Sequence, residues 1–211
     1  MPSSLLMKSN SFEIAPHVKN TDWQALRLTP ESEKSAWVKA LDIFRKRVNR
    51  FIEPVNALTS STSTKTILFS GFAIMALDCL LIETLQSFRT GRPNPVKAND
   101  RLSTKMIVDF LTKRPSFNIY FDDETKAKVF CDHFRNGILH QGEVKSSGRI
   151  RIDTLKMIMP SEDNQSFVVN RRIFHNALVQ EVENYVNELI DGKDVELRRN
   201  FIKKMNEICR L

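Results

Sequence analysis

Hydrophobic residues recur every three or four positions along most of the chain, and this spacing predicts a helical protein. A clear case is residues 37–52, where apolar side chains form one face and basic side chains the other. The sequence Thr29-Pro30-Glu31 offers a hydroxyl N-cap, a proline for the first helical position and an acid in the first turn. We therefore expect this helix to begin there. We expect it to end before Pro54, because a proline disfavours helix in the residue ahead of it.

A second helix is predicted from about Ile67 to Arg89, after a hydroxyl-rich stretch at 59–66 that indicates a loop. It is apolar on nearly all sides, which is typical of a buried central helix. Asp78 and Glu83 are the charged residues inside this apolar body. They interrupt it before it reaches the ~18 residues of a membrane-spanning helix, so we expect a soluble protein without a membrane partner.

Two more helices are predicted in the middle of the chain, between about residues 103 and 142. Ser103 is a candidate cap for a short helix that Pro115 stops. The acids Asp122-Asp123-Glu124 favour the start of another, which we expect to end at Gly142.

From Arg149 the spacing of apolar residues changes to two, which predicts a small β-hairpin insert at 149–169. Helical spacing returns at 171–190 and 195–209. We expect residues 1–28 to form an arm that Trp23, Leu26 and Leu28 dock onto the body. The predicted fold is therefore an all-α domain at 29–211 that carries the hairpin insert, preceded by the arm.

Composition narrows the choice of function. The 211 residues suffice for one large domain, and the net charge of +7 favours polyanionic partners. The chain has no GxGxxG or GxxxxGK[ST] sequence. Its three cysteines, Cys79, Cys131 and Cys209, match neither a zinc site nor a disulfide framework and suit a cytoplasmic protein. We expect neither a metal nor a cofactor.

Candidate chemistry concentrates in the helix that ends at Gly142, where Arg135, Asn136 and His140 lie within six residues. Histidine transfers protons near neutral pH, and arginine stays charged and binds phosphate oxygens through two N–H groups. An amide such as Asn136 orients an arginine or hydrogen-bonds phosphate. Together these residue types suit the cleavage of RNA, whose 2′-hydroxyl is a built-in nucleophile.

The segment 134–142 resembles the signature of the HEPN superfamily: an arginine, a neighbouring polar residue, and a histidine after four to six intervening residues. The order of the helices from about 35 to 190 is similar too. The resemblance implies a HEPN-like bundle of four to six helices. It also implies a metal-independent endoribonuclease that acts as a homodimer, with Arg135, Asn136 and His140 as its catalytic residues. Glu83 corresponds to the charged residue of a preceding core helix.

Such a protein would be a toxin or phage-defence effector held in check by an antitoxin or inhibitor protein. The alternatives are a non-catalytic HEPN-fold module that binds RNA or protein, and a helical scaffold with an incidental basic surface. Three cations that follow the motif, Lys145, Arg149 and Arg151, are expected to contact RNA.

Each site residue also has a structural interpretation. Arg135 could pair with Asp132 or Glu83, His140 could stabilise a helix C-terminus, and Asn136 could bond backbone carbonyls. A buried charge without a partner is costly, so we expect Asp78 or Glu83 to meet Arg135, and Glu83 is preferred. His175 is expected at the surface.

The spacing of Arg135 and His140 raises a geometric problem. Five residues along an α-helix turn a side chain by about 140° and move it by ~7.5 Å. One helix would then not close both residues around a phosphate, unless its last turn is distorted near Gly137. A two-fold dimer would bring two copies of the pair to one cleft. We therefore expect a basic cleft shared by two protomers and no activity from one protomer alone.

Overall fold

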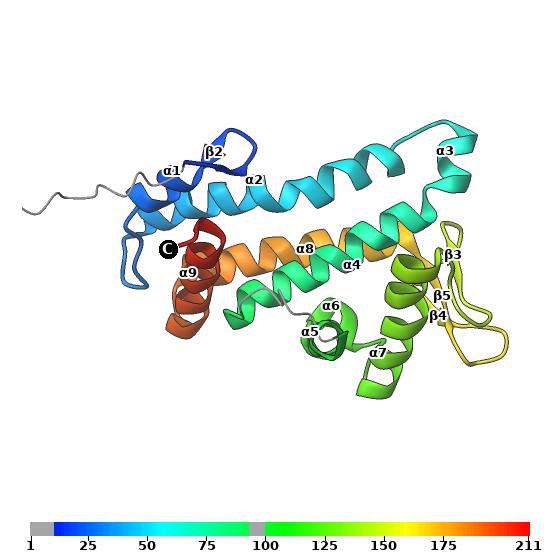
Figure 1. Ribbon diagram of the computed structural model, residues 1–211. Coiled ribbons are helices and arrows are strands. Elements are labelled where there is room, and N and C mark those ends of the chain that lie inside the picture. Colours follow the sequence, from blue (N-terminus) through cyan, green and yellow to red (C-terminus); the bar gives the residue numbers. More distant parts are fainter. Residues whose placement is uncertain (1–10, 93–99) are drawn as a thin grey trace, which may run out of the picture.

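The structure is a computed structural model that describes residues 11–92 and 100–211. The protein is mostly helical, as predicted, with small sheets of two and three strands (Figure 1). All-α is therefore too strict a description, because the described residues hold minor β-structure at two places.

Three long helices form the body: α2 (Lys34–Thr59), α4 (Gly71–Thr90) and α8 (Arg171–Asp191). They contact one another along the molecule, and α9 (Val195–Cys209) lies at one end of them (Figure 1). An aromatic cluster joins the four helices. The ring of Phe44 lies 4.9 Å from that of Phe88, 5.6 Å from Tyr185 and 5.7 Å from Phe201. These edge-to-face contacts fix how the helices pack.

The predicted ends of the first long helix are wrong at both sides. Thr29 to Ser32 form a turn in which the Thr29 N–H bonds the Ser32 hydroxyl, and the helix starts only at Lys34. Pro54 lies inside α2 rather than beyond its end. A proline there costs about 3 kcal/mol in a helix interior. Val55, fully buried one residue later, offsets part of this cost by its hydrophobic contacts.

The predicted helix 67–89 is two helices, α3 (Thr64–Phe69) and α4, separated at Ser70. The side chain of Ser63 caps α3 by accepting a bond from the Thr66 N–H. By length and composition α4 passes as a membrane span, in spite of its two acids. Of its apolar window 61% is buried inside the protein, which is also the pattern of a core helix.

The middle of the chain comprises α5 (Asp100–Lys113), α6 (Pro115–Asn118), α7 (Glu124–Phe130) and a π-helix, η1 (Cys131–Gln141). Ser103 lies inside α5 instead of capping it, because that helix already begins at Asp100. The start at Asp123 is confirmed, since its carboxylate accepts from the Lys126 N–H at 2.9 Å. Gly142 ends η1 as predicted, in a left-handed conformation (φ 68°) that favours glycine.

The insert at 149–169 is a three-stranded sheet of β3 (Arg149–Arg151), β4 (Ile158–Pro160) and β5 (Phe167–Asn170), in the order β3-β5-β4. The hairpin prediction is right for β4 and β5, which pair antiparallel. β3 instead pairs parallel with the far side of β5, from Arg149 opposite Val168 to Arg151 opposite Asn170. Alternation identifies a strand but not its neighbour, and this is why the parallel pairing of β3 with β5 was not predicted.

The described part of the N-terminal arm holds β1 (Glu13–Ala15), β2 (Val18–Lys19) and α1 (Asn20–Ala25). Trp23 is buried, and its indole N–H donates to the Asn206 side chain at 2.8 Å. The predicted docking of Trp23 is thus confirmed. The first ten residues of the arm lie outside the described residues.

Candidate functional site

The guanidinium of Arg135 is held by side chains from three helices. Its Nε donates to Glu83 on α4 at 2.9 Å, its Nη2 donates to the Ser103 hydroxyl on α5 at 2.9 Å, and its Nη1 donates to Asn136 at 3.0 Å. The ion pair is largely shielded, with the Arg135 side chain 12% and the Glu83 side chain 16% exposed. The predicted contact between Arg135 and Glu83 is present, and it fixes the direction of the guanidinium.

The exposed His140 completes the cluster, with its Nε2 lying 3.4 Å from Nη1 of Arg135. An arginine only donates hydrogen bonds, so this contact needs an Nε2 without a proton. The imidazole is then neutral and carries its proton on Nδ1. In this state its free nitrogen lies next to a cation and at the protein surface.

The π-helical geometry of η1 explains why these two residues meet. Its backbone hydrogen bonds join residues five apart, so Arg135 and His140 lie close to one face. Gly137 allows the chain to fold back here: a Cβ on it would lie 2.5 Å from the Glu143 carbonyl oxygen. The α-helical geometry assumed from the sequence was wrong, and a single protomer suffices to bring the pair together. Such π-helical segments occur often at functional sites.

Asn136 links the cluster to a second ion pair. Lys145 pairs with Asp132 at 2.8 Å, and the pKa of the Asp132 carboxyl is lowered, first by Lys145 and to a smaller extent by hydrogen bonding from Asn136. The Asn136 amide therefore presents its oxygen to Arg135 and its nitrogen to Asp132. Its predicted role in orienting the arginine agrees with these contacts.

Asp78 does not take part in this cluster. Its carboxylate lies 2.7 Å from Nδ1 of His175 on α8, and both residues are only 1% exposed. Burial raises the pKa of the Asp78 carboxyl, and the bond from His175 opposes that rise. The surface position expected for His175 is wrong, because a carboxylate buried in an apolar helix needs a polar partner, and α8 provides one.

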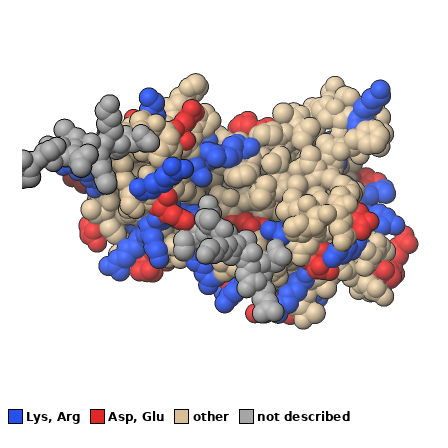
Figure 2. Space-filling view, viewed as in Figure 1, with Lys and Arg blue, Asp and Glu red and all other residues tan. Residues whose placement is uncertain are grey.

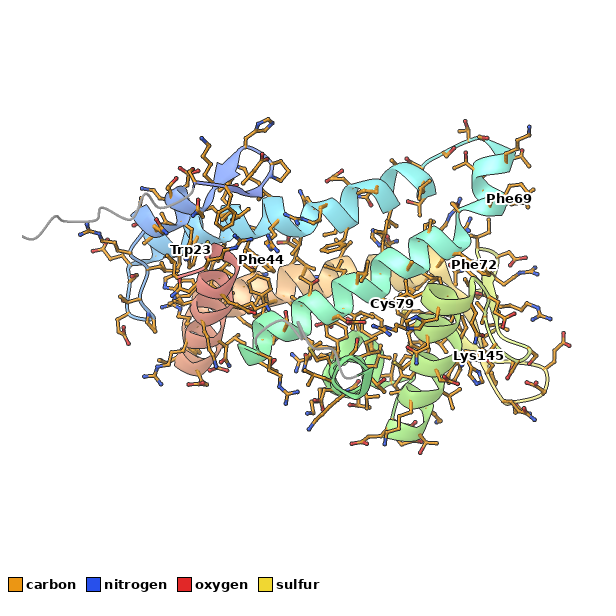
Figure 3. All side chains as sticks on the ribbon, in the orientation of Figure 1. Trp23, Phe44, Phe69, Phe72, Cys79 and Lys145 are labelled. Atoms are coloured by element: carbon orange, nitrogen blue, oxygen red, sulfur yellow. The ribbon has the colours of Figure 1, made fainter. Side chains whose placement is uncertain are left out.

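The three cations expected at RNA are in different surroundings. Lys145 lies beside η1, where its Cγ approaches Gly137 (Figure 3). Arg149 and Arg151 are exposed on β3, the first bonded to the Gly148 carbonyl and the second paired with Asp153 at 2.6 Å. Only Lys145 therefore lies directly beside the helix of the site.

Ser103 is the site residue that the sequence did not reveal. It lies on the buried face of α5, on the same side as Met106, Ile107 and Phe110. A small hydroxyl among these apolar positions was the available signal for a buried polar contact. It was instead interpreted as a helix cap, which is the commoner role of serine.

Two thiols lie near the site. Burial raises the pKa of Cys79 and of Cys131, and a protonated buried thiol is not a nucleophile. Within residues 11–92 and 100–211, no group of three or more His, Cys, Asp or Glu side chains is arranged to hold a metal ion.

Charge does not separate into one large basic surface on the face shown in Figure 2. Lys and Arg are interspersed with Asp and Glu, and an uncharged area lies towards α3. Comparison with models of protein families, with curated proteins and with solved structures found no match. The function is therefore inferred from the geometry of the cluster around Arg135.

Proposed function

We propose that this protein is a metal-independent endoribonuclease of HEPN type that uses Arg135 and His140. The observation that carries the proposal is the surface contact between the imidazole and a guanidinium fixed by Glu83, Ser103 and Asn136. The finer fold assignment, a HEPN-like bundle over about 35–190, belongs to the same proposal. It is supported by the packing of α2, α4, η1 and α8 and by the position of the motif in the chain.

The proposed reaction follows from the state of these two side chains. The unprotonated Nε2 of His140 takes the proton of the ribose 2′-hydroxyl, and the 2′ oxygen forms a bond to phosphorus. The bond from phosphorus to the 5′ oxygen breaks, which leaves a 2′,3′-cyclic phosphate and, after protonation, a 5′-hydroxyl. Arg135 stabilises the charge that develops on the phosphate oxygens. Loss of one such donor typically costs about 2.7–4 kcal/mol of barrier.

The leaving 5′ oxygen needs an acid, and we propose the His140 of a second protomer for this step. Leu80 on α4 and Leu139 on η1 are exposed leucines on the two helices that provide Glu83 and His140. Burial of such side chains in a two-fold interface would place the two sites beside each other. The homodimer, a role as a toxin or phage-defence effector in the cytoplasm, and control by an antitoxin or inhibitor protein are parts of this proposal.

The direct test is cleavage of labelled single-stranded RNA in EDTA by the wild type, Arg135→Ala and His140→Ala. Arg172→Ala is a matched control, because Arg172 is an exposed arginine on α8. We expect the wild type and the control to cut RNA, the other two to fail, and DNA of the same sequence to stay intact because it lacks the 2′-hydroxyl. Cutting by all four proteins would identify a contaminating nuclease and leave the proposal without support.

The second candidate is a non-catalytic module that binds RNA or protein. It is favoured by one observation, that Arg135 already has contacts with Glu83, Asn136, Ser103 and His140 and is thus strongly engaged within the protein. A protein that binds single-stranded RNA tightly but leaves it uncut over the same range of conditions would establish this alternative.

A further inference from the structure

A pocket with a volume of about 510 Å³ lies at the corner between α3 and α4. Its walls come from this corner, from the segment that leaves η1, and from β3. One wall is apolar and aromatic, and two arginines line the pocket. Its lining includes Phe69, Phe72, Glu143, Arg149 and Arg171.

Arg171 is the unusual side chain of this pocket. The residue is 6% exposed, its Nη2 donates to the Ile67 carbonyl, and its buried Nε has no hydrogen-bond partner. In the described part of the chain, no carboxylate lies within ion-pair distance of its guanidinium, and its pKa is lowered, chiefly by burial. A buried cation without a counter-charge is costly. An anion in the pocket would remove that cost.

Gly71 makes room for this guanidinium at the pocket wall. A Cβ at Gly71 would lie 2.8 Å from Nη1 of Arg171, which is closer than such atoms approach in proteins. The charged group of Arg171 therefore lies against bare backbone at the start of α4, where it lines the pocket.

Two phenylalanines form the aromatic wall. Phe69 is 81% and Phe72 41% exposed, and both lie at the α3–α4 end of the molecule (Figure 3). Exposed aromatic rings beside cations are typical of sites that stack unpaired bases while binding the neighbouring phosphate. Base pairs in a duplex would not offer their faces to these rings.

We propose that this pocket binds one nucleotide of single-stranded RNA, with its phosphate on Arg171 and Arg149 and its base against Phe69 or Phe72. The choice of RNA depends on the function proposed above. The pocket is connected to the candidate active site, because the Glu143 N–H donates to the Gly137 carbonyl of η1 at 3.2 Å. Phe72 and Glu83 are both on α4, about 16 Å apart along its axis. The bound strand thus extends from the cleavage site by a few nucleotides.

The test uses a short fluorescein-labelled 2′-O-methyl oligoribonucleotide, which lacks the free 2′-hydroxyl and stays uncut. Its affinity is measured by fluorescence anisotropy for the wild type and for the double variant Phe69→Ala/Phe72→Ala. We expect about tenfold weaker binding by the double variant, since stacking contributes roughly 1–3 kcal/mol per base and 1.4 kcal/mol is a factor of ten. Leu155→Ala, which removes an exposed side chain from the loop between β3 and β4, should bind like the wild type.

Arginine variants test the phosphate contact separately. Arg149→Ala should weaken binding several-fold and reduce its dependence on salt, whereas Arg172→Ala should do neither. Arg171→Lys keeps the charge but not the two-pronged geometry, and it should also bind more weakly. Its thermal unfolding must match that of the wild type, because Arg171 also bonds the Ile67 carbonyl.

The outcomes separate this pocket from the proposed enzyme. If the wild type cuts RNA but the phenylalanine and arginine variants bind the probe unchanged, the pocket assignment is overturned and the ribonuclease stands. If the probe binds as expected but no RNA is cut, the ribonuclease fails and the pocket stands. Loss of binding that coincides with dissociation of an oligomer in sedimentation would make the aromatic wall a protein interface, which also overturns the assignment.

Discussion

Asp78 and Glu83 lie five residues apart on α4 but in different environments. Asp78 pairs with His175 in the core, where both residues are almost completely buried. Glu83 pairs with Arg135 at a largely shielded position, and Arg135 in turn contacts the exposed His140. Both acids solve the same problem, a charge in an apolar helix, by finding a partner on a neighbouring element.

The difference between the two pairs is access to solvent. The second nitrogen of His175 and the second oxygen of Asp78 are buried without a hydrogen-bond partner in the described structure, so a substrate cannot reach them. Nε2 of His140 instead lies at the surface beside a fixed cation. We infer that the first pair contributes to stability and that the second is available for chemistry. Four predictions test this contrast.

The largest expected effect is on the rate at which the variant His140→Ala cleaves RNA. Loss of a general base typically lowers the rate roughly 100- to 10,000-fold. Because His140 is exposed, the melting temperature should stay close to that of the wild type. Single-turnover cleavage and thermal unfolding would measure the two effects. If the variant cuts at the wild-type rate, His140 is not the base.

The next effect is on stability, from His175→Leu. This change leaves the Asp78 carboxyl buried without its partner, and breaking a buried pair costs about 3 kcal/mol or more. Chemical denaturation at neutral pH would measure the loss. The double variant Asp78→Leu/His175→Leu removes both buried polar groups and should recover much of the stability. A single variant as stable as the wild type would show that the pair contributes nothing.

The sequence allowed the main elements to be predicted because their apolar positions are periodic and their caps are local. The ends at Asp123 and Gly142 were correct for this reason, since a carboxylate cap and a left-handed glycine act within one turn. Pro54 shows the limit. Its local preference is against helix, but the burial of Val55 depends on packing that no local pattern reveals.

In the site, too, local features were predictable and features that depend on packing were not. Arg135 and His140 were identified by residue type and spacing, and Glu83 by being a charge in an apolar helix. The sequence indicated that a last turn distorted near Gly137 would bring the first two together, but the π-helical hydrogen-bond pattern itself depends on how Gly137 packs against the Glu143 backbone. The partner of Asp78 was missed since His175 follows two arginines, which suggested a solvated surface.

A smaller effect is expected from Gly137→Ala. The added Cβ would collide with the Glu143 carbonyl oxygen, and such overpacking typically costs about 1–3 kcal/mol. The backbone of η1 would shift and the contact between Arg135 and His140 would lengthen. The rate of RNA cleavage should therefore fall by more than the loss of folding stability alone explains. Parallel measurements of kcat and of thermal unfolding would separate the two. Gly142→Ala is a useful comparison, because there the penalty comes from positive φ and not from a neighbouring atom.

The smallest effect concerns pH and the buried pair. The pKa of the Asp78 carboxyl in the folded protein is raised from its ordinary value of 3.8, mainly by burial. A raised pKa means that its contribution to stability is full below about 3.8 and is lost as the pH rises through the folded value.

Exposed acids with lowered pKa values, such as Asp163 at about 2, act in the opposite direction and overlap with it in the wild type. The difference in unfolding free energy between the wild type and Asp78→Asn isolates the Asp78 contribution. As the pH rises from about 4, the free energy of unfolding of the wild type should fall relative to that of Asp78→Asn. A difference that stays constant with pH would mean that folding does not change the pKa of the Asp78 carboxyl. The deep burial of Asp78 would then not distinguish its protonation from that of a solvent-exposed acid.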